Sequence, residues 1–360
     1  MEHKDNLFTY LKWRGDLPIT DVTFNEVDAL ILSELSYIRL DGVVCGPGEE
    51  GMITIREANE RYNKRNVKMM YYAEKEELFD VLAQSPRFAD MTLCNYVSMT
   101  DVEQQQQFAA MHVNITPSVT FIAFRGTDST IVGWKEDFNM SYMMPVPAQQ
   151  SAVDYVNQTV KGVFRKYYMG GHSKGGNLAI YSGMFCEPRI QKKIVKIYSF
   201  DGPGFNRNMV NDPAYAAIQD KILAYVPEES VIGLLMEHEE DYKVVKSDGV
   251  SLQQHEGFFW KVNRDRFELA DELNPRSKDM SDTVKSWLAK VSTEDRKTVV
   301  DTLFSLFENA GLEDFNDLEN IDANTVGALL KAVTMVPKKE RDLLGKLLLL
   351  FVEEHTKTTP

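Results

Sequence analysis

The chain has 360 residues, of which 43% are hydrophobic and 26% charged, a balance typical of a folded globular protein. Its formal net charge of −14 argues against nucleic acid as a partner, and its three cysteines are widely spaced without any C-x-x-C pair, which argues against a disulfide framework or a zinc site. No segment resembles a secretory signal or is apolar for long enough to span a bilayer, so we expect a cytoplasmic protein without an integral membrane segment.

Residues 1–90 predict a helical N-terminal segment that packs on the core. Apolar residues at helical spacing indicate an amphipathic helix over 24–37. Thr54 and Glu57 form the T-x-x-E pattern of a capping box that opens a second helix, and 74–83 favours a third.

Residues 91–273 alternate between β-rich runs and helical patterns. Strands are expected at 93–99, 107–115, 119–124, 167–170, 194–200 and 222–226, with helices over 152–164 and 175–185 and from residue 213. This alternation is typical of an α/β fold, in which crossover helices flank a mostly parallel sheet.

Residues 274–360 predict a C-terminal helical bundle with segments at 282–291, 295–309, 323–336 and 339–354. Apolar stripes such as Val299, Leu303, Leu306 and Phe307 must be buried against something. Two readings remain open: the helices pack on one another as an appended bundle, or part of their surface covers a cleft or joins a partner.

A G-x-S-x-G sequence centres on Ser173, between a strand-like segment and a helix rich in small residues. This strand–turn–helix context is that of the nucleophile elbow of α/β-hydrolases, where small flanking residues allow a sharp turn. The pattern predicts an α/β-hydrolase core in which Ser173 is the nucleophile.

A serine hydroxyl needs an imidazole to take its proton, and in this fold the histidine follows the serine in the chain. Three histidines satisfy that order. His238 lies in a run of charged residues suited to the surface, and His355 lies near the C-terminus. His255, just before an apolar Phe-Phe-Trp segment, is the favoured base.

The acid that orients the imidazole should follow a late strand of the sheet. Asp201 directly ends the strand at 194–200 and precedes a Gly-Pro-Gly turn. Glu228 and Glu229 follow the strand at 222–226, the other position where this fold supplies an acid. We favour Asp201, with Glu229 as the alternative.

The tetrahedral intermediate of acyl transfer needs two donors for its oxyanion. The backbone N–H of Lys174, directly after the nucleophile, is the first candidate. The second is Thr127, in the Phe-Arg-Gly-Thr sequence that follows the strand at 119–124.

These segments resemble the class 3 (fungal-type) lipases, through Phe124-Arg125-Gly126-Thr127 with Trp134 and Asp137, and through Gly171-His172-Ser173-Lys174-Gly175-Gly176. The resemblance covers 119–260 and implies an oxyanion role for Thr127 and a nucleophilic role for Ser173.

The chain departs from that family at two places. Lys174 stands where the family usually has leucine, and Glu229-Ser230-Val231 stands where it has Asp-x-Val. Ser199-Phe200-Asp201-Gly202-Pro203-Gly204 looks more like the pancreatic-type lipases, which favours Asp201 as the acid. The whole chain also resembles a family of uncharacterised bacterial proteins with a lipase-like core.

The sequence therefore predicts a serine hydrolase that cleaves carboxylic esters through a Ser-His-Asp triad and an acyl-enzyme, without a cofactor. The expected substrate is a small-molecule or lipid ester. Two alternatives remain: a non-catalytic binding or regulatory protein on the same scaffold, and a thioesterase or peptidase with the same triad. The pattern specifies neither acyl-chain length nor oligomeric state.

Overall fold

The computed structural model describes residues 5–62, 73–312, 314 and 331–358. The chain forms two compact units, each made of segments that are distant in the sequence. The first comprises Met1–Met99, Phe108–Gly126 and Gln149–Asn274; the second comprises Thr100–Gln107, Thr127–Ala148 and Pro275–Pro360.

An eight-stranded sheet follows the order of the chain from β1 to β8. β1 pairs with β2, and β3 with β4, in antiparallel fashion, whereas β4 to β8 are parallel. The expected strands are thus confirmed, and β1 and β8, which were not expected, complete the sheet. The bounds are β1 Ile53–Thr54, β2 Thr92–Asp101, β3 Gln106–Thr116, β4 Val119–Phe124, β5 Lys166–His172, β6 Ile194–Phe200, β7 Ile222–Pro227 and β8 Tyr242–Val245, with a separate hairpin of β9 Val262–Asn263 and β10 Arg266–Phe267.

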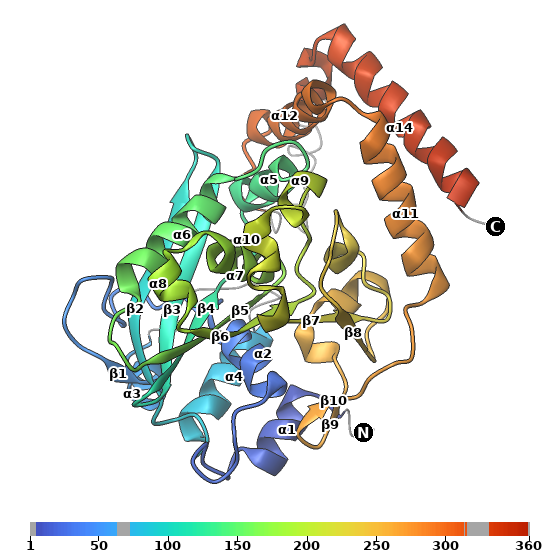
Figure 1. Cartoon of the computed structure of the whole chain (residues 1–360). Helices are drawn as coiled ribbons and strands as arrows, with labels where there is room; N and C mark the ends of the chain where they lie inside the picture. Colours follow the sequence, from blue (N-terminus) through green and yellow to red (C-terminus); the bar gives the residue numbers. More distant parts are fainter. Residues whose placement is uncertain (1–4, 63–72, 313, 315–330, 359–360) are drawn as a thin grey trace. The chain divides into compact units, whose positions relative to one another are not determined.

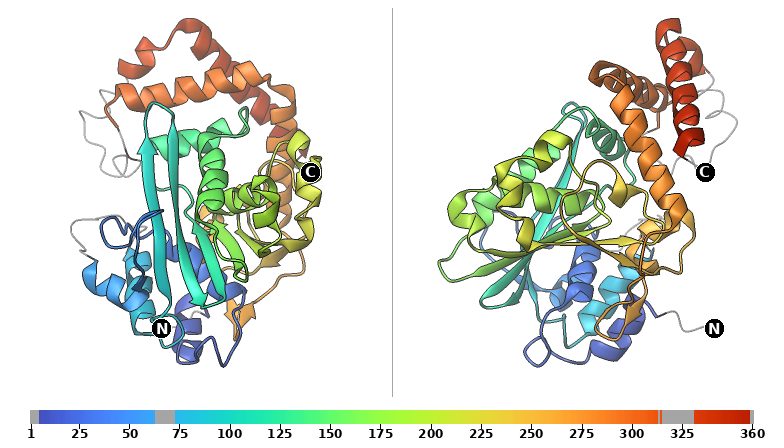
Figure 2. Two further views of the ribbon diagram at one scale, coloured as in Figure 1. Left: turned by 60° about the vertical axis from the view of Figure 1, so that its left-hand side comes forward. Right: turned by 45° about the vertical axis from the view of Figure 1, so that its right-hand side comes forward.

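Helices cover both faces of the sheet in the first unit (Figure 1, Figure 2). α7 packs on β4, β5 and β6 from one side, and α2 packs on the same three strands from the other. This is the layered architecture of the α/β-hydrolase fold, as predicted. The helices on the α7 side are α6 Pro147–Thr159, α7 Lys174–Phe185, α8 Pro188–Gln191, α9 Arg207–Val210 and α10 Pro213–Ala216; those on the α2 side are α1 Leu7–Arg14, α2 Glu26–Leu35, α3 Ile55–Arg61 and α4 Ala73–Gln84.

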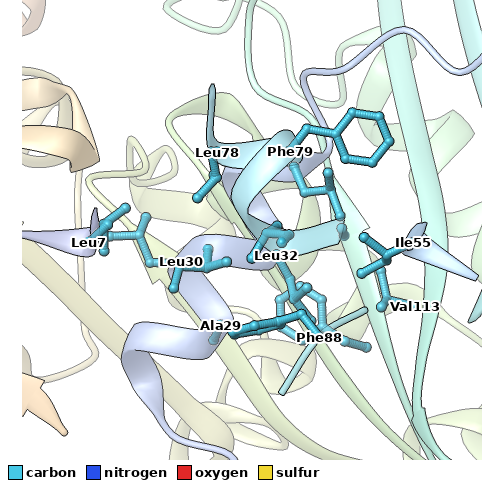
Figure 3. Close-up of a cluster of buried hydrophobic side chains, with 14 of the residues drawn as sticks. Leu7, Ala29, Leu30, Leu32, Ile55, Leu78, Phe79, Phe88 and Val113 are labelled. Atoms are coloured by element: carbon cyan, nitrogen blue, oxygen red, sulfur yellow. The ribbon is translucent and has the colours of Figure 1, made fainter. Parts of the chain in front are cut away.

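The N-terminal helices supply much of the main core. α2 begins with a capping box between Asn25 and Asp28, and the predicted box of Thr54 and Glu57 opens α3. Every residue of α2 from 27 to 35 is buried. Figure 3 shows its apolar side chains packed among residues of neighbouring elements: Leu7, Ala29, Leu30, Leu32, Ile55, Leu78, Phe79, Phe88 and Val113.

In its described part, the second unit contains the helices α5 Ile131–Asn139, α11 Pro275–Lys290, α12 Thr293–Asn309 and α14 Lys338–Thr358. α12 packs on α5 through Ile131, Val300 and Phe304. Leu303 and Phe307 of the predicted stripe are partly buried against this cluster, whereas its buried apolar members on α12 are Val300 and Phe304. The sequence did not predict α5. The expected helix at 323–336 lies mostly outside the described residues. Within the described part of the chain, no helix is long and apolar enough to cross a membrane.

Candidate active site

Ser173 occupies the sharp turn between β5 and α7. Its backbone has φ 56° and ψ −134°, and its N–H donates to the Phe200 carbonyl at 2.9 Å. A left-handed φ is costly for a residue with a side chain and is typical of functional sites. A Cβ at Gly175 would lie 2.2 Å from the Phe124 carbonyl oxygen, so the turn requires glycine there. The predicted elbow geometry is present.

Asp201 follows β6 at the same carboxyl edge of the sheet. It is fully buried, has a left-handed φ of 49°, and donates its N–H to the Tyr225 carbonyl at 2.8 Å. Its Oδ1 accepts a hydrogen bond from Ser230 Oγ at 2.5 Å. Gly233, in the 3₁₀ turn Ile232–Leu234, lies so close that a Cβ there would meet this oxygen at 2.1 Å. The carboxylate is therefore rigidly held.

His255 ends the 3₁₀ turn Ser251–His255, and its Nδ1 lies 2.6 Å from Asp201 Oδ2. Since a carboxylate only accepts, Nδ1 carries the proton and Nε2 is left as the basic nitrogen. Burial lowers the pKa of His255, but the hydrogen bond and negative charge of Asp201 outweigh it, and the pKa is raised above its ordinary value.

The carboxylate of the alternative acid, Glu229, contacts the backbone at the start of the turn that ends at His255, instead of the imidazole ring of His255. Its two carboxylate oxygens accept hydrogen bonds from the Ser251 N–H and the Asn274 side chain, each at 3.1 Å. The other two histidines have different partners: His238 Nδ1 lies 3.0 Å from Glu240, and His355 Nδ1 lies 3.4 Å from Thr283.

His172, the residue before Ser173, connects the elbow to His255. Its ring lies 4.5 Å from that of His255, centroid to centroid, and its Nε2 lies 2.7 Å from the His255 carbonyl oxygen. Because the His255 carbonyl oxygen only accepts, His172 Nε2 is the donor, and burial keeps the pKa of His172 below its ordinary value. Among the described residues, no hydrogen bond joins Ser173 Oγ to His255 directly.

A buried polar group behind His172 was not predicted from the sequence; we call it the Glu34 cluster, comprising Glu34, Tyr37, Lys75, His172 and Glu256. Lys75 Nζ lies 3.4 Å from Glu34 and 3.3 Å from Glu256. His172 Nδ1 lies 3.6 Å from Glu34 and 3.2 Å from the Tyr37 hydroxyl. Burial raises the pKa of Glu256, but Lys75, His172 and His255 outweigh it and lower that pKa to about 2.

The two proposed oxyanion residues lie in different compact units. Lys174 opens α7 and directly follows Ser173 in the chain. In the second unit, the Thr127 hydroxyl donates to Asp137. Gly126, the last residue of its segment in the first unit, contacts the elbow: a Cβ there would lie 3.1 Å from Ser173 Cβ and 2.5 Å from the His172 carbonyl oxygen.

Among the described residues, no group of three or more His, Cys, Asp or Glu side chains could hold a metal ion. The strand order, the elbow and the flanking helices define a protein of the α/β-hydrolase fold.

Comparison with known protein families places the chain more narrowly. The Mbeg1-like family model matches residues 82–305, more than half of the chain, and the chain belongs to this family. No curated protein matches it significantly.

Three solved structures show limited similarity. M37 lipase has a TM-score of 0.36 at 14% identity, covering 59% of this chain and 70% of its own. The native Rhizomucor miehei lipase propeptide complex has a TM-score of 0.31 at 18% identity, covering 43% and 57%. The lipase from Rhizopus microsporus var. chinensis has a TM-score of 0.28 at 14% identity, covering 51% and 69%.

Proposed function

We propose that the protein is a serine hydrolase in which Ser173 attacks a carboxylic ester, His255 transfers the proton and Asp201 orients His255. The observation that carries the proposal is the 2.6 Å contact between Asp201 and His255 beside a serine with left-handed backbone. Asp201 holds His255 in the tautomer that leaves Nε2 basic, which is what a serine nucleophile requires.

The reaction would proceed in two halves. His255 Nε2 takes the proton of Ser173 as Oγ attacks the acyl carbon, then gives it to the departing alkoxide, which leaves an acyl-enzyme. Water then attacks the acyl-enzyme with His255 again as base, and Ser173 is released with its proton. Apo active sites often have long hydrogen bonds between nucleophile and base, so the present Ser173 geometry is compatible with this role.

For the oxyanion, we propose the backbone N–H groups of Lys174 and Thr127. Lys174 lies at the N-terminus of α7, where the helix dipole favours negative charge. The support for Thr127 is the Arg-Gly-Thr motif and the contact of Gly126 with the elbow. No metal or cofactor enters this scheme.

Ser173→Ala tests the nucleophile. We expect loss of p-nitrophenyl ester hydrolysis by a factor on the order of 10⁶, with loss of labelling by a fluorophosphonate probe. Ser182→Ala is the matched control, since this buried serine of α7 donates only to the Ala179 carbonyl among the described residues. It should keep activity and labelling.

The result separates the alternatives. If the unchanged protein neither reacts with the probe nor cleaves any ester, thioester or peptide in a substrate panel, the alternative hypothesis of a non-catalytic binding or regulatory protein is supported instead. If only thioesters or peptides are cleaved, the triad stands and the ester class is wrong.

The identity of the acid is tested by two amide variants. Asp201→Asn should lower turnover by roughly 10⁴, because an amide presents the wrong hydrogen-bonding group to Nδ1 and no charge to the imidazolium. Glu229→Gln should have a far smaller effect, because Glu229 contacts Ser251 and Asn274. An inactive Glu229 variant beside an active Asp201 variant would reverse the assignment.

A further inference from the structure

Val163 and Phe164 have the most exposed large hydrophobic side chains in the described part of the chain, at 81% and 92%. They lie side by side in the short loop between α6 and β5. Burying such side chains normally stabilises a fold, so two adjacent ones left in water are a departure from ordinary folding. A single exposed apolar residue needs no explanation, but this pair does.

Contacts on both flanks fix the loop so that this pair projects outward. The Tyr167 hydroxyl lies 3.2 Å from the Lys161 N–H and 2.7 Å from its carbonyl oxygen. Lys193 Nζ donates to the Gly162 carbonyl at 2.6 Å, and Gly162 has a left-handed φ of 79°.

On the other flank, Arg165 donates to Asn114 Oδ1 at 2.5 Å, to Thr120 Oγ1 at 2.9 Å and to the Pro117 carbonyl at 3.0 Å. These contacts join the residue directly after Phe164 to the ends of β3 and β4 and to the turn between them. The apolar pair is therefore presented by a rigid support.

The surroundings of the pair are basic although the chain carries a net charge of −14. Lys161, Lys166 and Lys192 are exposed, and Lys193 is half-buried. They gather at the amino ends of β5 and β6, since Tyr167 donates its N–H to the Lys193 carbonyl. The acidic residue nearby in sequence, Glu187, is paired with Arg189. We call residues 161–166 with Lys192 and Lys193 the basic tip.

We infer that the basic tip docks on the surface of an anionic phospholipid bilayer, with Val163 and Phe164 inserted among the headgroups. Lysines on long aliphatic stems pair with headgroup phosphates while apolar neighbours enter the interface, so both kinds of side chain favour binding to such a surface. A stable interface with a folded protein buries about 800 Å² of surface on each partner, which is more than two side chains on a projecting tip can offer. A bilayer has no such requirement.

This docking is an anchoring function and does not depend on the proposed hydrolysis. The tip lies at the amino end of β5 and Ser173 at its carboxyl end, about 20 Å away at the rise of a β-strand. The strongly acidic remainder of the chain is repelled by anionic lipid, so the tip sets the orientation of the protein on the surface.

Co-sedimentation of the full chain with phosphatidylcholine vesicles, with and without phosphatidylglycerol, tests the inference. We expect binding only to vesicles that contain phosphatidylglycerol, weakened by added salt. The double variant Val163→Ser/Phe164→Ser should lower the partition constant about tenfold or more, and Lys161→Gln/Lys166→Gln should have a comparable effect.

Val102→Ser is the matched control, because Val102 is 72% exposed but lies between Asp101 and Glu103. It should bind vesicles as the unchanged chain does, and Ser173→Ala should also bind fully, which separates this result from the fate of the proposed function. Equal partitioning of the double serine variant, or binding that ignores phosphatidylglycerol, would overturn the inference. So would a concentration-dependent dimer that the double variant abolishes without any vesicle binding, since a second copy would then occupy the tip.

Discussion

Helix α2 carries two fully buried carboxylates, Asp28 and Glu34, whose surroundings differ sharply. Asp28 is saturated with hydrogen bonds. Arg87 donates to both of its oxygens, at 2.7 and 2.5 Å, and the Tyr10 hydroxyl and Asn25 N–H donate at 2.7 and 3.0 Å. Arg87 uses its remaining donors on three carbonyl oxygens of the segment 17–23.

Glu34 has none of this support. Neither of its carboxylate oxygens accepts a hydrogen bond from a described residue, and its partners are Lys75 at 3.4 Å and His172 at 3.6 Å. An unsatisfied buried carboxylate is costly, so its retention beside His172 and His255 needs a reason other than stability. Two carboxylates that are equally buried on one helix therefore differ in how far hydrogen bonds satisfy them, and this difference predicts different effects of mutation.

The largest expected effect falls on the saturated cluster. Arg87→Met should lower the free energy of unfolding by about 3–5 kcal/mol in a denaturant titration, because it leaves Asp28 buried without its cation. Activity per folded molecule should stay unchanged. The control is Arg56→Met, whose partner Asp90 is exposed, and here the loss should be under about 1 kcal/mol. If the two variants lost equal unfolding free energy, the buried hydrogen bonds of Asp28 would not be what makes Arg87 important for stability.

The next effect concerns His172, which joins the Glu34 cluster to the candidate site. His172→Phe keeps the ring volume but removes the donor to the His255 carbonyl, so His255 is held less firmly. We expect kcat/KM to fall about tenfold, mainly through kcat, with fluorophosphonate labelling slowed to match. The control is His112→Phe in β3, a buried histidine bonded to Asn95 and Thr159, where only stability should fall. Equal activity in the two variants would contradict a positioning role.

The sequence predicted the parts of this site that depend on local pattern. Ser173 and Asp201 are each marked by the end of a strand and by neighbouring glycines, and the structure places both at one edge of the sheet. Glu34 could not be found in this way, because it lies on a helix 139 positions before Ser173 and reads as an ordinary polar residue. Its position beside His172 depends on α2 packing behind β5, which is long-range information.

Two further features of the structure could not be predicted for the same reason, because they too depend on long-range packing. α5 was not predicted, because its sequence Ile131–Asn139 mixes polar and aromatic residues, and its burial depends on α12, more than 150 positions later. Ser230, which donates to Asp201, lies in the segment considered for the alternative acid. The sequence does not show this contact, because it depends on how the segments after β6 and β7 come together in the folded sheet.

The smallest expected effect comes from Glu34→Gln, which tests directly whether the Glu34 carboxylate acts on His255. The unfolding free energy should change by less than about 1 kcal/mol, because Glu34 accepts no hydrogen bond from a described residue and Lys75 keeps Glu256 as a partner.

The pH dependence of activity should change instead. Burial lowers the pKa of His255, while Asp201, Glu256 and Glu34 raise it, so removing the Glu34 charge lowers that pKa. The base must be unprotonated, so the rising limb of kcat/KM against pH should move to lower pH by less than about one unit. Glu60→Gln, an exposed change on α3, should leave the limb in place. A limb that stays fixed in the Glu34 variant, or moves to higher pH, would show that this carboxylate does not act on the base.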